Sequence, residues 1–506
     1  MAQTPSASSS APATSSATPS AAQPGDHGTP ALPEQGSPDS GRVSLAGAEP
    51  AIALGALDGR YRPVVAALVD HLSEAALNRN RVHVEVEWFI HLCQRRALPG
   101  LEPLDQGQID GLRGIVLDFD AAAVAELAEI EAVTVHDVKA VEYFIGRRLP
   151  ALGLDRLKPL VHFACTSEDI NNLAYAVGIR DAVARVWAPA ASELVDGIAA
   201  LARESAAVPM LSRTHGQPAT PTTLGKELAV FVQRLTRQLD RVRSTGFLGK
   251  INGATGTYAA HMAAAPETDW QEISRSFVEG LGLTWNPLTT QIESHDWQAE
   301  LYADVARFNR ILHNLCTDIW AYISIGFFRQ VPVEGATGSS TMPHKINPIR
   351  FENAEANLEI SCSLLDTLGA TLVTSRWQRD LTDSSSQRNI GTAFGHSLLA
   401  ISNVAKGMKR LNVADDVMAE ELDANWEVLG EAVQTVMRAE AIAGTQGMDD
   451  PYERLKELTR GHRVDRQRLQ EFVKGLGLGP AAEQRLSGLT PATYTGIAEE
   501  LLKHLR

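Results

Sequence analysis

The feature that most constrains this chain is a short polar loop that cannot be helical, set between two long helical patterns. Residues 338–348 read GSSTMPHKINP, and apolar residues recur at helical spacing over about 294–328 before the loop and about 351–373 after it. The glycine that begins the loop gives backbone freedom, and each of its two prolines ends any helix at the preceding residue. The sequence therefore predicts a polar loop held between the ends of two long helices.

Helical patterns also fill most of the remaining chain, which predicts an all-α fold. The clearest covers about 222–245, where apolar residues are spaced by three or four positions, as in the seam of a helix bundle. The residues of this apolar seam are Leu224, Leu228, Phe231, Leu235, Leu239 and Val242. Further helical patterns cover about 63–98, 121–148, 384–411 and 413–442.

The domain organisation is expected to begin with a disordered tail at residues 1–48. This segment is rich in Ala, Ser, Thr, Pro, Gln and Gly, and it cannot bury enough apolar surface to offset its ordering entropy. It also lacks the basic and apolar regions of a signal peptide. The rest is expected to form an N-terminal helical domain at 49–157, a central long-helix domain at 158–411 and a C-terminal helical domain at 412–506.

Composition excludes several classes of function. The net charge of −15 argues against a nucleic-acid partner, and no apolar stretch approaches the ~18 residues of a membrane span. The four cysteines show no CxxC spacing, which fits a reducing cytoplasm. The fourteen histidines show no metal-ligand spacing. We therefore expect a cytoplasmic enzyme of 506 residues that needs no metal and no other cofactor.

The polar loop carries groups that suit anion binding and proton transfer. Ser339 and Ser340 are adjacent hydroxyls, Lys345 and Asn347 follow them, and Glu352 lies in the first turn of the next predicted helix. Small and polar residues of this kind also fill ordinary surface turns, and GSS alone would indicate no more than that. The whole string with its spacing is more specific.

A second candidate is His215, in the segment SRTHGQPATP at 212–221. The glycine and prolines around it predict a stiff turn rather than a helix interior. A histidine titrates near neutral pH and can donate a proton to a leaving nitrogen. Taken alone, His215 is equally well explained as a structural residue.

Two polar motifs precede His215. His136 and Asp137 lie within the helical pattern at 121–148, where such a pair is most often a surface feature or a satisfied core pair. Thr166 and Ser167 begin the run TSED, which is typical of a helix N-terminus. The free N–H groups of a helix start suit a substrate carboxylate as well as a capping side chain.

A basic cluster follows the polar loop. Arg379, Ser384 and Arg388 lie in the segment 375–389, which is rich in arginines and hydroxyls. The alternative is a solvated face in which Asp380 and Asp383 pair with the arginines.

Together these motifs resemble those of the fumarase/aspartase superfamily, whose members release fumarate by β-elimination. The MPHK form of the loop and the basic cluster resemble the adenylosuccinate lyase family within it. The resemblance runs from about residue 52 to the end of the chain. It implies cleavage of adenylosuccinate to AMP and fumarate, and parallel cleavage of succinylaminoimidazole carboxamide ribotide, in purine nucleotide biosynthesis.

The resemblance also implies a role for each motif. Ser339 would be the general base, His215 the general acid, Lys345 a group that stabilises developing negative charge, and Glu352 the partner that orients the acid histidine. The implied substrate-binding residues are Arg60, Tyr61, His136, Asp137, Thr166, Ser167, Gln291, Ser340, Asn347, Arg379, Ser384 and Arg388.

The superfamily further implies a homotetramer whose active sites combine motifs from three chains, and exposed apolar seams at 222–245 and 294–328 would be consistent with it. Argininosuccinate lyase is an alternative, against which the MPHK loop and the basic cluster argue. A helical binding protein that has lost catalysis is another. The complete set of proton-transfer residues argues against that second alternative.

Overall fold

The computed structural model describes residues 53–332, 345–459 and 464–505. The chain divides into two units between Gly59 and Arg60, and every helix and strand below belongs to the second unit, Arg60–Arg506. The tail predicted at 1–48 and the two serines Ser339 and Ser340 lie outside the described residues.

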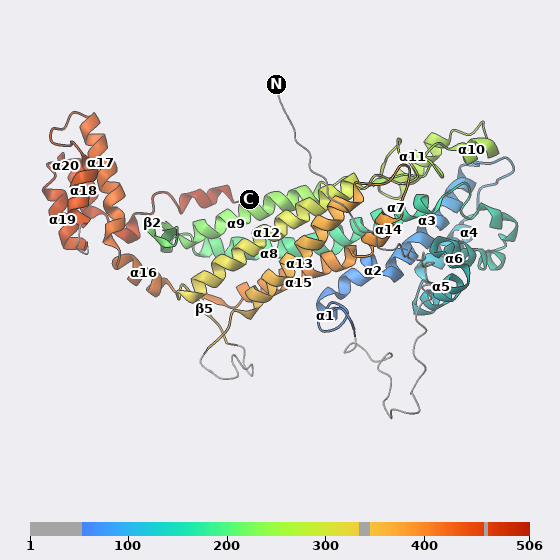
Figure 1. Cartoon of the computed structure of the whole chain (residues 1–506), viewed down its shortest axis with the longest axis horizontal. Coiled ribbons are helices and arrows are strands. Elements are labelled where there is room, and N and C mark those ends of the chain that lie inside the picture. Colours follow the sequence, from blue (N-terminus) through green and yellow to red (C-terminus); the bar gives the residue numbers. More distant parts are fainter. Residues whose placement is uncertain (1–52, 333–344, 460–463, 506) are drawn as a thin grey trace, which may run out of the picture. The chain divides into compact units, whose positions relative to one another are not determined.

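Long helices form the centre of the second unit, as the helical spacing predicted (Figure 1). They are α7 (Ser167–Ala182), α8 (Ala188–Glu204), α9 (Leu224–Arg243), α12 (Asp296–Ser324), α13 (Ile349–Leu372) and α15 (Ile390–Met408). Helix α12 packs against α9 and α13, α13 packs against α15, and α8 packs against α9 and α15. A π-helical turn, Val183–Trp187, joins α7 to α8.

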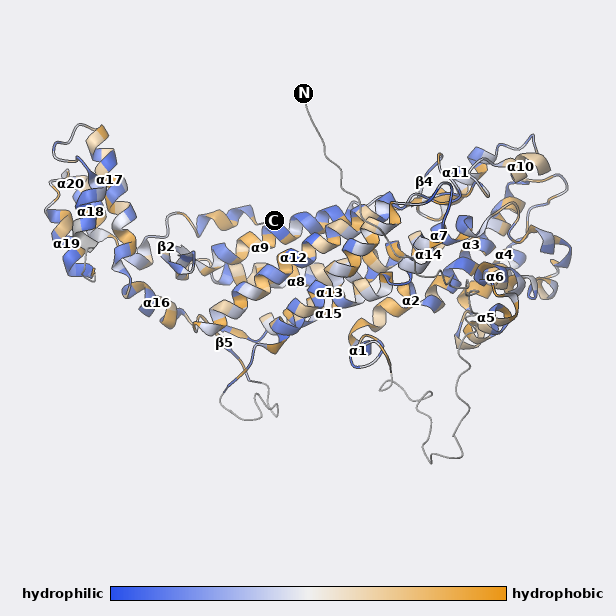
Figure 2. Ribbon diagram, in the orientation of Figure 1, coloured by the Kyte–Doolittle hydropathy of each residue, from blue (hydrophilic) through white to orange (hydrophobic). Residues whose placement is uncertain are grey.

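The apolar seam predicted over 222–245 is buried within the chain itself. All six of its residues lie in the buried core, where α9 contacts α8 and α12. Figure 2 shows polar residues alternating with apolar ones along α9 and α12, as amphipathic bundle helices require. The expectation that this seam is exposed was wrong, because neighbouring helices of the same chain cover it.

The segment before α7 is divided into shorter helices. They are α1 (Arg62–Val65), α2 (Val69–Leu72), α3 (Glu74–Gln94), α4 (Gln106–Leu117), α5 (Ala121–Thr134) and α6 (Asp137–Gly146). The single helix predicted over about 63–98 is broken at Ser73. The hydroxyl of Ser73 accepts the N–H of Ala76 at 3.0 Å and so begins a new helix.

The strands are short and occur in three pairs within the described residues. They are the antiparallel pair β1 (Pro209–Thr214) and β2 (Gln217–Thr223), the parallel pair β3 (Leu248–Gly249) and β4 (Thr284–Trp285), and the antiparallel pair β5 (Phe328–Gln330) and β6 (Leu411–Val413). The short helices α10 (Ala259–Ala264), α11 (Trp270–Gly280) and α14 (Thr382–Gln387) complete this part of the chain.

The C-terminal helices are α16 (Asp415–Asp423), α17 (Gly430–Ile442), α18 (Pro451–Thr459), α19 (Arg466–Lys474) and α20 (Pro480–Gly488). Helices α17 to α20 share a small hydrophobic core of their own, which includes Trp426, Met437 and Leu469, whereas Met418 of α16 belongs to the main core. The single helix predicted over 413–442 is interrupted at Asn425, whose backbone is not helical and whose side chain donates to the carbonyl of Glu421 at 2.7 Å.

Among the described residues, no helix is long and apolar enough to cross a membrane. Within the same residues, no group of three or more His, Cys, Asp or Glu side chains could hold a metal ion.

Candidate active site

His215 lies at the tip of the β1–β2 hairpin. His215 and Gly216 form the two-residue turn, with φ of 52° and 75°. Positive φ at both central residues gives the turn a twist that matches the flanking strands. The histidine side chain is exposed, so the stiff turn predicted from the surrounding glycine and prolines displays an imidazole to solvent.

Two contacts join the hairpin to the C-terminal helices. Arg213 of β1 forms an ion pair with Glu421 of α16. Thr220 of β2 donates to Glu431 of α17 at 2.7 Å. Both strands of the hairpin are therefore held against the C-terminal helices, through Arg213 two residues before His215 and Thr220 five residues after it.

The pair His136 and Asp137 lies at the start of a helix rather than in its middle. Helix α5 ends before Val135, whose φ of 51° is rare for a β-branched residue, and the Nδ1 atom of His136 accepts the N–H of Lys139 at 3.2 Å. The continuous helix predicted over 121–148 was therefore wrong. The break turns His136 outward and leaves Asp137 as the first residue of α6.

Asp137 faces two arginines. Arg81 Nη2 lies 2.6 Å from Asp137 Oδ2, and Arg388 Nη2 lies 3.5 Å from the same oxygen. Burial favours a higher pKa for Asp137, but the charge of Arg81, the N–H of Val138 and the charge of Arg388 together lower the pKa below its usual value. Asp137 is therefore ionised, and it connects α6 to the basic cluster.

Thr166 and Ser167 stand at the start of α7, as the TSED run predicted. The N–H of Thr166 donates to Asp169 Oδ2 at 2.8 Å, as in a capping box. Asp169 also accepts Lys250 Nζ and the N–H of Asn252, each at 2.9 Å. The glycine-rich turn at 249–256 is therefore docked onto this helix start.

Gln291 lies beside the same glycine-rich turn, because its amide donates to the carbonyl of Ala254 at 2.9 Å. The two loops approach closely at Gly256, where an added Cβ would lie 2.3 Å from the carbonyl oxygen of Thr289. The position of Gln291 is therefore set by the turn that contacts the start of α7.

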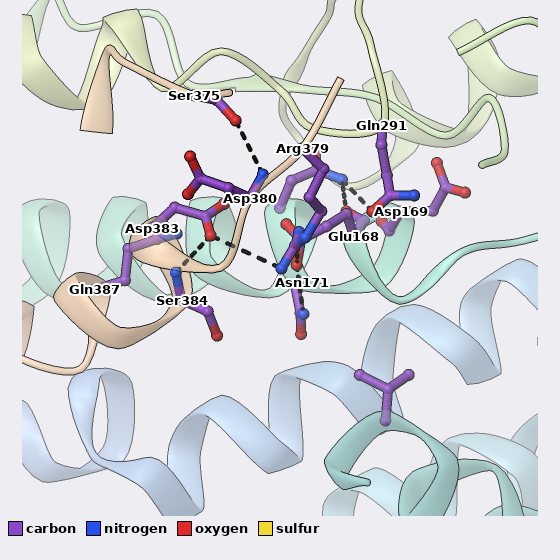
Figure 3. Close-up of polar contacts among 12 residues, drawn as sticks. Glu168, Asp169, Asn171, Gln291, Ser375, Arg379, Asp380, Asp383, Ser384 and Gln387 are labelled. Carbon is purple, nitrogen blue, oxygen red and sulfur yellow. Dashed lines mark hydrogen bonds and ion pairs between the residues drawn. The ribbon is translucent and has the colours of Figure 1, made fainter. Parts of the chain in front are cut away.

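The basic cluster meets the same region. Arg379 lies between Glu168 of α7 and Asp383 of α14, at 2.6 and 3.7 Å (Figure 3). The carboxylate of Asp383 also accepts the N–H of Ser384 at 2.6 Å. The structure thus brings Arg379 and Ser384 to the start of α7.

The arginines of the basic cluster are all paired with carboxylates. Besides the contacts of Arg379, Arg388 pairs with Glu74 at 2.5 Å, and Arg376 pairs with Asp380 at 3.3 Å. The alternative in which Asp380 and Asp383 pair with arginines therefore describes part of the observed contacts. Since an arginine carries five N–H donors, these ion pairs leave capacity for a phosphate.

The remaining predicted residues lie near the start of α13 or, in the case of Arg60 and Tyr61, immediately before α1. Glu352 accepts the indole N–H of Trp320 at 3.1 Å, and Tyr61 accepts Asn353 Nδ2 at 3.1 Å. Lys345 is exposed. Asn347 is partly buried, and the exposed Arg60 has its guanidinium 6.0 Å from the ring of Tyr61.

His215 and the helix start at Thr166 therefore lie at opposite ends of α9. The hairpin with His215 precedes α9, whereas β3 and the glycine-rich turn that docks on Thr166 follow it. A helix of 20 residues spans about 30 Å. In the described part of the chain, no hydrogen bond or ion pair joins His215 to Glu352.

Sequence reasoning missed several buried polar residues of this region. Glu168 was interpreted only as an acidic residue of a first helical turn, yet it is buried and pairs with Arg379. Arg81 and His295 are also buried and contact Asp137 and Asp383. Helical spacing does not identify these three residues. The one signal available in the sequence is a charged residue in an otherwise apolar run.

Comparisons with known proteins define the class. Residues 59–360 match the lyase family, and residues 375–495 match the family of adenylosuccinate lyase C-terminal domains. The fold is similar to that of 3-carboxy-cis,cis-muconate lactonizing enzyme from Pseudomonas putida, with a TM-score of 0.68 and 22% identity over 87% of this chain and 96% of the other. It is also similar to fumarate lyase from Mesorhizobium sp. BNC1, with a TM-score of 0.69 and 20% identity over 87% and 97%. The fold and the family match therefore define an all-α lyase of the fumarase/aspartase superfamily.

Curated relatives narrow the assignment. The chain is 47% identical to the adenylosuccinate lyase of Escherichia coli (strain K12) over 455 residues, which cover 90% of this chain and 98% of the relative. It is 46% identical to the adenylosuccinate lyase of Haemophilus influenzae over 454 residues, with the same coverage. The chain belongs to the adenylosuccinate lyase family.

Proposed function

We propose that this chain cleaves adenylosuccinate to AMP and fumarate, and likewise cleaves succinylaminoimidazole carboxamide ribotide, in purine nucleotide biosynthesis. The observation that carries the proposal is the meeting of Arg379 and Ser384 with the helix start at Thr166 and Ser167, in a member of the adenylosuccinate lyase family. Arginine forks suit a phosphate, and the N–H groups of a helix start suit a carboxylate. A lyase acting on unphosphorylated substrates would not need the basic cluster.

Each set of proposed binding residues contacts a different part of the substrate. Arg60, Tyr61, Arg379, Ser384 and Arg388 would hold the nucleotide phosphate. The carboxylates of the succinyl group would be held by Thr166, Ser167, Ser340, Lys345 and Asn347. The remaining substrate contacts would be His136, Asp137 and Gln291.

The proposed reaction needs one base and one acid. Ser339 removes the proton from the carbon next to the one that bears nitrogen, the C–N bond breaks as the double bond of fumarate forms, and His215 gives a proton to the departing nitrogen. Lys345 stabilises the negative charge that collects on the neighbouring carboxylate, and Glu352 orients the imidazole. Because a serine hydroxyl is a weak base, Ser339 requires activation by its surroundings. General acid or base assistance is typically worth about 10²–10⁴-fold in rate.

We also propose that the active enzyme is a homotetramer whose sites are shared between chains. The support is geometric: His215 precedes α9, whereas Arg379 contacts the helix start that lies beyond its other end. A rigid helix of about 30 Å cannot bend to bring these groups to one substrate. A second copy of the chain would supply the missing group at each site.

A cytoplasmic location and the domain boundaries at 49–157, 158–411 and 412–506 remain part of this proposal. The four cysteines, Cys93, Cys165, Cys316 and Cys362, are all free thiols. Free thiols are typical of reducing compartments.

The direct test follows the purine absorbance of purified protein with adenylosuccinate, beside an argininosuccinate control. We expect turnover of adenylosuccinate alone, and its loss in His215→Ala. A folded protein that turns over only argininosuccinate, or neither compound, would overturn the proposed substrate.

Subunit complementation tests the shared site. His215→Ala and Arg379→Ala each remove one group from opposite ends of α9. If sites are shared, mixing the two inactive variants under conditions that exchange subunits restores part of the activity, because some hybrid sites receive both intact groups. Mixtures that exchange subunits yet stay inactive would contradict it.

A further inference from the structure

His295 is a buried histidine that the proposed reaction does not use. It lies four residues after Gln291, immediately before α12, with a φ of 61° and 1% of its surface exposed. Its backbone N–H donates to Glu293 at 3.0 Å. A left-handed backbone and a buried polar ring are both unfavourable unless other contacts compensate for them. The hydrogen bonds of the His295 ring therefore indicate its role.

The contacts of His295 fix which ring nitrogen carries the proton. Tyr302 donates its hydroxyl to Gln298 Oε1 at 3.0 Å, so the amide nitrogen of Gln298 is the atom that faces His295 Nδ1, at 3.3 Å. With Nδ1 accepting, Nε2 carries the hydrogen of the neutral ring. That nitrogen lies 3.3 Å from Asp383 Oδ2. His295 therefore donates to Asp383.

Asp383 connects His295 to the basic cluster. While Oδ2 faces His295, Oδ1 accepts the N–H of Ser384 at 2.6 Å and lies 3.7 Å from Arg379 Nη2. The closer partner of Arg379 is Glu168, at 2.6 Å. Both oxygens of Asp383 thus have a hydrogen-bond partner, and the carboxylate meets the Arg379 guanidinium only at the longer distance of 3.7 Å, the contact drawn in Figure 3.

We propose that His295 is a positioning residue for recognition of the substrate phosphate, and this inference rests on the proposed function. By holding Asp383, His295 keeps that carboxylate from closing onto Arg379 and competing with a phosphate for its N–H donors. Charge-assisted pairs of an arginine with a carboxylate are strong and often bidentate, so a released Asp383 would be an effective competitor. The same hydrogen bond fixes the start of α14 and with it Ser384.

A matched pair of substitutions isolates this hydrogen bond. In His295→Asn the amide can occupy the place of Nδ1 beside Gln298 but is too short to reach Asp383, and asparagine tolerates a positive φ. In His295→Gln the longer amide can place its nitrogen near the position of Nε2 and donate to Asp383. Both variants keep a polar side chain, so both are expected to fold.

The experiment measures binding of AMP and of adenosine to the purified full-length enzyme by calorimetry, with circular dichroism as the check on folding. We expect His295→Asn to weaken AMP binding about tenfold, the effect of one well-made hydrogen bond, and to leave adenosine binding unchanged. His295→Gln should restore most of the AMP affinity. The KM for adenylosuccinate should rise with that Kd, while kcat changes little.

Several outcomes would overturn the inference: equal weakening of AMP and adenosine, no weakening of either, or the same AMP affinity in the Asn and Gln variants. Equal weakening would mean that His295 only supports the fold. Failure of the proposed function is distinguishable, because it would show as absence of adenylosuccinate turnover by the wild-type enzyme.

Discussion

Lys250 Nζ lies 2.9 Å from Asp169 Oδ1, and both side chains are completely buried. Asp169 also accepts backbone N–H groups of Thr166 and Asn252. One ion pair therefore joins the glycine-rich turn to the helix start that carries Thr166 and Ser167. Neither the Lys250 ammonium nor the Asp169 carboxylate has access to water, so each charge needs the other for the fold to be stable.

Replacing Lys250 by methionine should lower the free energy of unfolding by about 3–5 kcal/mol, because Asp169 would remain as a buried charge without its counter-ion. Urea unfolding of the purified protein measures the loss. The matched control is Lys409→Met, since Lys409 and its partner Glu193 are each 75% exposed and such a pair contributes at most about 1 kcal/mol. Equal losses in the two variants would contradict this account.

At Gly256, the effect of the short distance to Thr289 can be measured separately from the effect of the left-handed backbone. Gly256 has a φ of 73°, and an added Cβ would lie 2.3 Å from the carbonyl oxygen of Thr289. Gly153 has a similar φ of 70°, but its Cβ would meet nothing within 4 Å. We expect Gly153→Ala to cost about 1–2 kcal/mol, the left-handed strain alone.

Gly256→Ala should cost clearly more than Gly153→Ala, because the carbonyl of Thr289 would have to move. That movement should also displace Gln291, so the KM for adenylosuccinate should rise in Gly256→Ala and stay unchanged in Gly153→Ala. Unfolding curves and steady-state kinetics of both variants measure the two effects. A Gly256→Ala enzyme with the stability and KM of the Gly153→Ala enzyme would show that the two loops tolerate a wider spacing.

His261 gives the fold a sensitivity to acid. Burial chiefly lowers the pKa of His261 from 6.5 to about 4, with the charge of Asp169 opposing and that of Lys250 assisting the shift. Neither ring nitrogen has a hydrogen-bond partner among the described protein groups. As the pH falls below 6.5, the unfolded chain takes up a proton at this histidine before the folded chain does.

The free energy of unfolding should therefore fall between pH 6.5 and 4, and the contribution of His261 to that fall should approach about 3 kcal/mol. His261→Phe removes the titrating group and leaves no new unpaired polar atom. Urea unfolding at several pH values should show a shallower slope for the variant in this window. Parallel slopes for the two proteins would contradict the assignment.

The helices were largely predictable from the sequence, and their breaks were not. The spacing of Leu224, Leu228 and Leu235 marks α9, because burial of one helix face follows directly from a period near 3.6 residues. The breaks at Ser73 and Val135 depend on single side chains that compete with the helical backbone, and apolar spacing continues across both. Periodicity alone therefore joined helices that local capping separates.

The candidate site likewise has features that the sequence predicted and features that it did not. The local structure of two motifs, the turn that carries His215 and the helix start at Thr166, was predictable. The partners of the arginines were not, since Glu168 and Asp383 contact Arg379 from two helices more than 200 residues apart in sequence. Such pairings are set by tertiary packing, which one sequence without its structure does not specify.

His215 is the proposed acid that protonates the leaving nitrogen. Its imidazole is exposed at a turn with a φ of 52°, a backbone conformation that asparagine also adopts readily. His215→Asn should therefore fold normally and lose about 10²–10⁴-fold in kcat for adenylosuccinate, since asparagine cannot donate a proton to the leaving nitrogen. Steady-state kinetics and urea unfolding of the same preparation measure both quantities, and His504→Asn, at the exposed end of the last 3₁₀-helix, is the control. An unchanged kcat would contradict the role of His215 as the acid. A fall in kcat that is fully explained by loss of folded protein would contradict it as well.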